Sequence, residues 1–237
     1  MALSREIGVL RRMIACYALV LFSVFVGLLA LPLEGPSYAV RQFLSAKETL
    51  IPDSVPIVAL GPVAPFVAPI MMALLIALLI TFPFGLWFIF RFLRPALRSG
   101  ERRTLTHTIV PSLILFYSGC ATAYFFIIPR TFSILYSFAE PMGVAPFFAL
   151  DEFISSVFFL TISVGIAFLL PVVMVVSSRL GFIPQGFWLR HWRGAVFSAI
   201  FFSAIVTPDG SGVTMAFLSV PLIVLYGIGA VVIVRRA

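Results

Sequence analysis

Charged residues are scarce in this sequence. Only 11% of the 237 residues are Asp, Glu, Lys or Arg, whereas 62% are hydrophobic, and soluble domains carry about a quarter charged residues. A soluble fold could not bury this much apolar surface, so lipid must surround much of the chain. The apolar runs are long and do not alternate as barrel strands do, so helices are the spanning structure that remains. We therefore predict an all-α polytopic membrane protein, folded as a single integral membrane domain over residues 1–237, with no sizeable soluble domain.

Residue types that carry catalysis or bind metals are also few. The only cysteines, Cys16 and Cys120, lie inside apolar runs, and the only histidines, His107 and His191, lie near segment ends. No Cys-x-x-Cys or His/Cys cluster is present, so we expect no metal and no cofactor. No nucleophile is placed beside a base, so we expect no catalytic residues and no enzyme. The net charge is +7, and the basic residues that produce it lie in the connections between apolar runs. This placement is typical of cytoplasmic loops of a membrane protein, so we expect no nucleic-acid partner.

Six apolar segments are predicted to enter the membrane, at about residues 13–31, 66–90, 105–138, 153–176, 194–206 and 213–234. The first is too long for a signal-peptide core and lacks an Ala-x-Ala-like site after it, so we expect a span. The third segment is longer than the hydrocarbon requires, so we expect it to tilt, to kink at Pro129 or to protrude on the far side, and Pro171 predicts a kink in the fourth. The fifth covers only about 20 Å along a helix. The fifth and sixth segments therefore form a helical hairpin around a tight turn at 207–212.

Basic residues are distributed on alternate sides of these segments. The N-terminal region, the loops at 91–103 and 179–193 and the C-terminal end each carry net positive charge, and the intervening regions sum to a net negative charge. Cytoplasmic loops are enriched in Lys and Arg. We therefore predict that both termini are cytoplasmic.

The loop from Arg91 to Arg103 combines charge with an apolar side. Glu101 is its single acid among several arginines, Pro95 interrupts the helix, and Phe92 and Leu97 supply apolar surface. One interpretation is a positive-inside loop in which Glu101 neutralises its neighbours. The other is a peptide-binding surface at the membrane edge, since a carboxylate can hold a guanidinium in a bidentate pair. Composition alone leaves both open.

Several short motifs follow one another along nearly the whole chain. They are Ala64-Pro-Phe-Val-Ala-Pro69, Phe82-Pro83, Phe92-Leu-Arg-Pro-Ala-Leu97 with Glu101-Arg-Arg103, Leu115-Phe-Tyr-Ser-Gly119 with Ala123-Tyr-Phe125 and Pro129, Gly165 with Phe168 and Pro171, Thr207-Pro-Asp209, and Ala216 to Tyr226. In this order and spacing the sequence resembles the TatC family, the multispanning receptor subunit of the twin-arginine protein translocase.

The resemblance implies a cup-shaped fold of six transmembrane helices, the last two short, in the cell membrane. It implies binding of twin-arginine signal peptides and partnership with small single-span TatA/TatB-type subunits in a multimeric complex that moves folded proteins using the proton-motive force. The implied signal-peptide residues are Glu101, Glu6, Arg11, Phe92, Pro95, Leu97, Arg102 and Arg103. The implied partner-helix or structural residues are Tyr124, Leu169, Thr207, Asp209 and Thr214.

The sequence departs from the family pattern at several positions. Leu169 stands where relatives often carry Glu or Gln, and Ala64 and Gly227 replace acids. These departures predict apolar rather than polar partner contacts near Leu169. Two rival functions remain, a secondary transporter of small solutes and an intramembrane enzyme. The lack of a midplane charge and of an internal repeat argues against the first, and the lack of a catalytic pair against the second.

Overall fold

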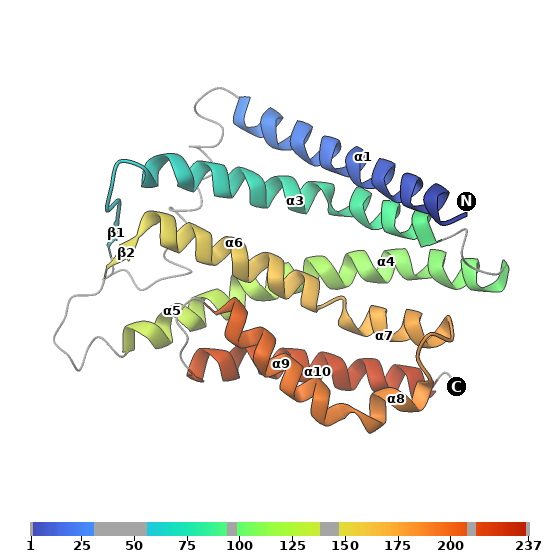
Figure 1. The fold of residues 1–237 in the computed structure, drawn as a ribbon. Coiled ribbons are helices and arrows are strands. Elements are labelled where there is room, and N and C mark those ends of the chain that lie inside the picture. The colour runs from blue at the N-terminus through green and yellow to red at the C-terminus, as the bar shows by residue number, and fades with distance from the viewer. Residues whose placement is uncertain (1, 31–55, 94–98, 138–146, 208–211, 236–237) are drawn as a thin grey trace.

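The structure is a computed structural model that describes residues 2–30, 56–93, 99–137, 147–207 and 212–235. Its long helices lie roughly side by side in a bundle (Figure 1). In the described part of the chain, five helices are long and apolar enough to cross a membrane, at Gly8–Ala30, Ala64–Phe92, Thr106–Leu135, Leu150–Arg179 and Thr214–Ile233. A shorter apolar helix, Trp192–Val206, accompanies them. These six segments match the predicted ones closely, and the all-α membrane class is confirmed.

The elements follow one another as α1 (Ala2–Ala30), β1 (Ile57–Val58), α3 (Ala64–Leu93), α4 (Ser99–Thr122), a π-helical turn (Ala123–Ile127), α5 (Ile128–Ser137), β2 (Phe148–Ala149), α6 (Leu150–Ala167), α7 (Leu170–Arg179), α8 (Gln185–Arg190), α9 (Trp192–Val206) and α10 (Gly212–Arg235). The two strands are two residues each and pair in parallel. They join the segments that precede α3 and α6, a contact too short for the sequence pattern to predict.

Helix α3 continues through two internal prolines. Pro83 has no N–H, so the carbonyl of Leu79 lacks its donor one turn later. The hydroxyl of Tyr117 on α4 donates to that carbonyl at 2.8 Å. Beside it, the rings of Phe82 and Phe116 stack with centroids 3.4 Å apart. The Tyr117 hydroxyl thus replaces the hydrogen bond that Pro83 cannot donate to the Leu79 carbonyl. Within a membrane such a carbonyl needs a partner from the protein.

The third span contains a π-helical turn, Ala123–Ile127, just before Pro129. The N–H of Ile128 donates to the carbonyl of Ala123, five residues earlier. A proline cannot donate to the turn before it, and a π-turn is one way for a helix to accommodate this. Of the three expectations for this long segment, the structure shows a helical irregularity just before Pro129.

The fourth span divides into α6 and α7. Phe168 and Leu169 form the break, and Pro171 lies at the start of α7. The N–H of Leu169 donates to Ile166, three residues back. The predicted kink at Pro171 is confirmed, and the break falls two to three residues ahead of the proline, where its ring would crowd the preceding turn.

The main core lies where α3 and α6 meet the π-helical turn and α5. The backbones of α4 and α6 approach closely because both carry glycine at the crossing. A Cβ on Gly165 would lie 2.5 Å from the Sγ of Cys120, and one on Gly119 would lie 2.7 Å from the ring of Phe168. Phe153 and Leu160 of α6 are fully buried here. In lipid the hydrophobic effect does not drive helices together. Small residues instead allow close van der Waals packing between their backbones.

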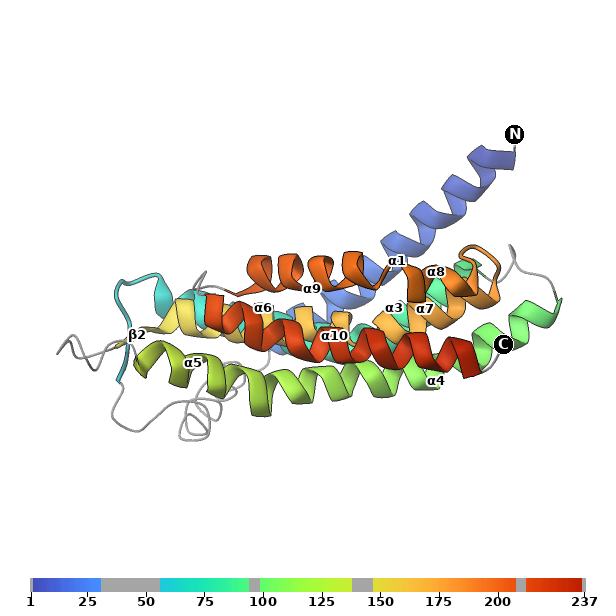
Figure 2. The same cartoon turned by 90° about the horizontal axis from the view of Figure 1, so that it is seen from below.

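Helix α1 lies at the edge of the bundle against α3, and its N-terminal half rises away from the other helices (Figure 2). None of its residues from Gly8 to Ala30 is buried. Its start lies at the same end of the bundle as the ends of α3, α7 and α10 (Figure 1). Arg91 and Arg179 occupy the last turns of α3 and α7, whereas Asp151 and Glu152 open α6 at the opposite end.

The last two helices form the expected hairpin, and one detail of the prediction is wrong. Helix α9 has 15 residues, as short as predicted. Helix α10 has 24 residues, at about 36 Å long enough to span, so only one of the two is short. Asp209, which separates them in the sequence, lies outside the described residues.

Candidate functional site

A first apolar cavity of about 340 Å³ lies between α1 and α3, at the end of the bundle where α1 begins. Its walls come from Leu10, Met13, Ile14 and Tyr17 of α1, and from Phe82, Gly85, Leu86, Phe88, Ile89 and Phe92 of α3. The four α1 residues fall at i, i+3, i+4 and i+7, which places them on one helix face. Gly85 makes the contact possible, because a Cβ there would lie 2.9 Å from the ring of Tyr17. We call this the α1–α3 cavity.

The structure places part of the predicted signal-peptide site around this cavity. Phe92 lines it, and Arg11 is exposed on α1. Position 6 precedes position 10 by one turn of α1, on the stripe that lines the cavity. Positions 101 to 103 fall in the first turn of α4. Pro95 and Leu97 lie outside the described residues, as do the side chains of Glu6, Glu101, Arg102 and Arg103.

The helix ends beside the α1–α3 cavity carry exposed cations. Arg91 lies over the ring of Trp87, 5.1 Å from its centroid, within the range of a cation–π contact. Arg11 and Arg12 are exposed on α1. A carboxylate in the first turn of α4 is favoured by the positive end of the helix dipole. The basic parts of α1 and α3 and the start of α4, whose sequence contains Glu101, therefore lie at one end of the bundle beside an apolar cavity.

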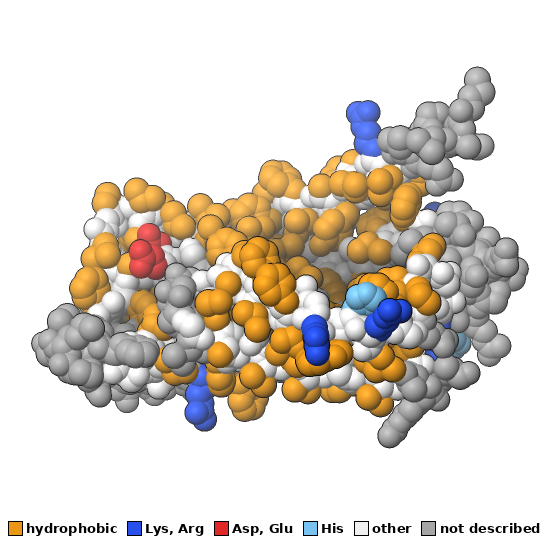
Figure 3. Space-filling model, turned by 60° about the horizontal axis from the view of Figure 1, so that its bottom comes forward, with side chains coloured by type: hydrophobic (Ala, Val, Ile, Leu, Met, Phe, Trp, Pro, Cys, Tyr) orange, Lys and Arg blue, Asp and Glu red, His pale blue; other side chains and the backbone are white. Residues whose placement is uncertain are grey.

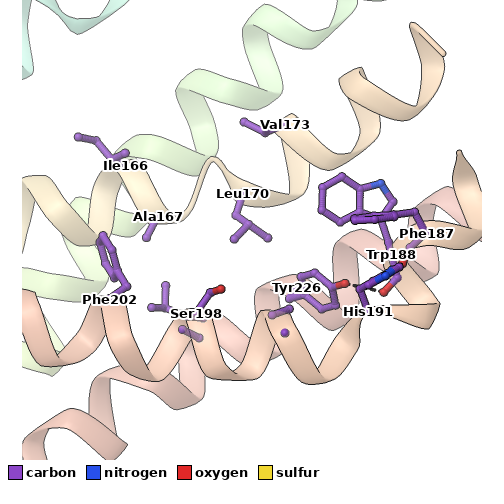
Figure 4. A pocket seen from close by; sticks show the side chains of 14 residues that line it. Ile166, Ala167, Leu170, Val173, Phe187, Trp188, His191, Ser198, Phe202 and Tyr226 are labelled. Carbon is purple, nitrogen blue, oxygen red and sulfur yellow. Dashed lines mark hydrogen bonds between the residues drawn. The ribbon is translucent and has the colours of Figure 1, made fainter. Parts of the chain in front are cut away.

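A second cavity, of about 680 Å³, lies where α8, α9 and α10 face the break between α6 and α7 (Figure 4). Its lining residues are Ile166, Ala167, Leu170, Val173, Phe187, Trp188, His191, Gly194, Ala195, Ser198, Ala199, Phe202, Leu222 and Tyr226. Most of these side chains are apolar. Small residues on one face of α9 leave the room between the helices. We call this the α9 cavity.

The short helix α8 is fixed to its neighbours by two hydrogen bonds. The indole Nε1 of Trp188 donates to the Oγ of Ser178 on α7 at 2.8 Å. The hydroxyl of Tyr226 on α10 donates to the carbonyl of Trp188. His191 stacks on Phe187 with ring centroids 4.0 Å apart. These contacts hold the aromatic end of the α9 cavity in place.

The predicted partner-helix residues are placed mostly inside the chain. Thr207 and Thr214 are buried, and the hydroxyl of Thr207 donates to the carbonyl of Ser203 at 2.9 Å. Tyr124 is half-buried in the π-helical turn and packs against the core. Leu169 is half-buried at the break before α7. The two threonines are thus buried inside the chain, whereas Tyr124 and Leu169 both retain part of their surface.

Sequence reasoning missed the α9 cavity and helix α8. The segment at 185–190 is too short to be predicted as a helix, and a cavity built from five helices has no sequence signature. The pattern of Trp188, Trp192 and nearby arginines was the available signal, because aromatic and basic residues collect at membrane interfaces. Among the described residues, no group of three or more His, Cys, Asp or Glu lies close enough to hold a metal ion.

The spans, the proline-broken helices and the two cavities define a multi-pass α-helical membrane protein. The profile of the family described as "Sec-independent protein translocase protein (TatC)" matches residues 7–221. The chain belongs to the TatC family, a family of protein translocase components.

Individual relatives agree with this assignment. The TatC protein of Cenarchaeum symbiosum is 35% identical over 205 residues, 86% of this chain and 77% of that protein. The TatC protein of Aquifex aeolicus is 31% identical over 175 residues, 73% of this chain and 72% of its own length. The match to the Synechocystis TatC protein, at 32% identity, spans 59% of that protein. A crystal structure of a twin-arginine translocase receptor, TatC, superposes with a TM-score of 0.82 at 25% identity, covering 96% of this chain and 97% of that one.

Proposed function

We propose that this chain is the subunit of a twin-arginine translocase that binds the arginine pair of signal peptides at its cytoplasmic face. It lies in the cell membrane with both termini in the cytoplasm. With small single-span TatA/TatB-type subunits it moves folded proteins across the membrane, driven by the proton-motive force. Family membership and the similarity to a crystal structure of a twin-arginine translocase receptor support this proposal.

The observation that carries the proposal is the α1–α3 cavity. Phe92 lines it, and position 6 of α1 lies one turn before Leu10, the first lining residue of that helix. Glu101 is then the principal carboxylate for the arginine pair, with Glu6 as the second. Phe92, Pro95 and Leu97 give an apolar wall on which the hydrophobic stretch that follows the arginines starts along the membrane edge. Arg11, Arg102 and Arg103 keep the surroundings basic, which discourages cations other than a correctly placed pair.

Substituting Glu101 tests the site directly. Glu101→Gln should weaken binding of an Arg-Arg signal peptide by at least tenfold, because a charge-assisted hydrogen bond contributes about 1.5–3 kcal/mol. Binding of a Lys-Lys peptide, which lacks the bidentate geometry, should change much less. The measurement is peptide affinity to purified protein in nanodiscs.

Glu152→Gln is the matched control, because Glu152 is exposed in the first turn of α6 at the opposite end of the bundle. It should bind the Arg-Arg peptide as the parent protein does. Equal affinity of the parent and of folded Glu101→Gln would overturn the assignment of Glu101. It would leave Glu6 to be tested in the same way.

The proposed orientation has its own test. Gly61 and Gly186 are exposed, and a Cβ at either position meets nothing within 4 Å. In a background lacking Cys16 and Cys120, an impermeant thiol reagent outside intact cells should label Gly61→Cys. It should label Gly186→Cys only after the membrane is opened. The reverse pattern would place the termini outside.

Partner subunits complete the complex. Leu169 replaces the acid or amide that relatives often carry, so single-span partners pack there by apolar contact. Thr207 and Thr214 are buried at the two ends of the α9–α10 connection, and the Thr207 hydroxyl bonds back to Ser203 within its own segment, so their role is structural rather than contact with a partner.

A further inference from the structure

The α9 cavity is suited to hydrocarbon and not to a polar ligand. His191, Ser198 and Tyr226 are its polar lining side chains, and the others are aliphatic, aromatic or glycine. The hydroxyl of Tyr226 is already donated to the carbonyl of Trp188. Figure 4 shows aliphatic and aromatic side chains around most of the space. A polar solute would lose its hydration here without finding partners.

The cavity extends over the depth of one membrane leaflet. Its lining on α9 runs from His191 to Phe202, about 16 Å along a helix. The hydrocarbon of a bilayer is about 30 Å thick, so each leaflet contributes about half. Trp188 and Trp192 lie near the His191 end, and tryptophan favours the membrane interface. The cavity therefore starts at the interface and ends near the bilayer centre, as an acyl chain does.

Positive charge collects at the interface end of the cavity. Arg190 and Arg193 flank His191, and all three are exposed. Arg193 lies over the ring of Trp192 at 5.6 Å. No Asp or Glu occurs in residues 170–207 or 212–235, so no acid in α7 to α10 neutralises them. Figure 3 shows arginine and histidine side chains together at the edge of a hollow with hydrophobic side chains around it.

We propose that the α9 cavity binds an anionic phospholipid, with an acyl chain between α9 and the α6–α7 break and its phosphate against Arg190, His191 and Arg193. Guanidinium groups bind phosphate oxygens in bidentate geometry, and basic pockets between membrane helices bind acidic headgroups. A single-span helix is the competing occupant. It would use a surface about 30 Å long, whereas the lining of this cavity stops at Phe202.

Tryptophan quenching measures occupancy of the cavity directly. The chain has three tryptophans, so Trp87→Phe with Trp192→Phe leaves Trp188, whose indole is fixed in the cavity wall by Ser178. The protein is placed in nanodiscs of phosphatidylcholine with increasing phosphatidylglycerol, with bromine on the acyl chains of one lipid at a time. Brominated phosphatidylglycerol should quench Trp188 at a mole fraction at least fivefold lower than brominated phosphatidylcholine.

Two pairs of variants separate a built site from general surface charge. Arg190→Gln and Arg193→Gln should each reduce the preference by up to about fivefold, the effect of one basic residue at a charged membrane surface, whereas Arg11→Gln and Arg12→Gln on α1 should leave it unchanged. Ala195→Phe should fill the cavity and remove the quenching, whereas Ala216→Phe, at an exposed position on α10, should not.

Three results would overturn the proposal. The two brominated lipids could quench Trp188 equally, which would mean bulk lipid only. The α1 arginine variants could reduce the preference as strongly as those at 190 and 193. A photo-crosslinker at Ser198 could react with a single-span subunit in native membranes and not with lipid, which would assign the cavity to a helix.

Discussion

Helices α1 and α6 are both apolar enough to span a membrane, yet the protein holds them very differently. On α6, Phe153, Ile154 and Leu160 are almost completely buried, and Gly165 touches α4 with no space for a methyl group. On α1, no described side chain from Gly8 onward is buried, and Phe22 and Leu19 are about two-thirds exposed. Lipid satisfies both helices equally well, so hydropathy cannot distinguish them.

The difference indicates what each helix is for. A helix fixed by close packing keeps the shape of the bundle, because interhelical contact and not hydrophobicity drives association in lipid. A helix held on one side only can shift against its neighbour at small cost. The α1–α3 cavity lies between one helix of each kind, so a shift of α1 would change its width.

The largest contrast is expected from a glycine on each helix. Gly165→Leu forces its side chain into Cys120 and Phe116, and overpacking on this scale should cost about 3 kcal/mol or more of stability. Gly27→Leu on α1 meets nothing within 4 Å and should change stability by less than about 0.5 kcal/mol. Denaturation in mixed micelles measures both. Equal losses would show that α1 is packed as tightly as α6.

The contact between Gly85 and Tyr17 should give a smaller effect confined to α1. Gly85→Ala places a methyl group 2.9 Å from the Tyr17 ring, and the ring can move, so the cost should be about 1 kcal/mol. In a Tyr17→Ala background the same substitution should cost nothing. A double-mutant cycle of unfolding free energies tests this. An undiminished cost in that background would place the strain elsewhere on α3.

The smallest effect is expected where α3 meets α4. Tyr117→Phe removes the donor to the Leu79 carbonyl, and hydrogen bonds between membrane helices contribute about 0.6 kcal/mol. Pro83→Ala restores an N–H to that carbonyl, so Tyr117→Phe should then be nearly silent. The same unfolding assay gives both values. If Tyr117→Phe cost as much in the Pro83→Ala background as in the parent protein, the hydroxyl would act through another partner.

Much of this fold could be predicted because lipid imposes simple rules on the sequence. The predicted segments at 66–90 and 194–206 differ from Ala64–Phe92 and Trp192–Val206 by at most two residues at each end. Pro129 and Pro171 each lie just after an irregularity, the π-helical turn in the third span and the α6–α7 break in the fourth. An apolar run marks only the membrane-spanning part of a helix and stops at the first charged residues. The sequence therefore predicted α1 from residue 13, although its helix starts at Ala2.

What could not be predicted depends on contacts between distant segments. The close crossing at Gly119 and Gly165 needs both helices in place, and so does the α9 cavity with Trp188 and Tyr226 from separate helices. The expected shortness of the last helix came from resemblance and is wrong for α10, whose apolar run alone favours a full span. In the candidate site, Phe92 could be found by motif, but its facing partners on α1 could not.

The π-helical turn at Ala123–Ile127 acts as an angular offset in the third span. One residue beyond the α-helical count turns everything that follows by about 100° around the axis. Phe132 and Thr131, both buried, face the core only because of that rotation, while Arg130 stays at the surface. Removing a single residue from the turn would leave hydropathy and length nearly intact. It would nonetheless rotate the whole of α5 about its axis. The number of residues in the turn, as well as their composition, therefore decides which side chains of α5 face the core.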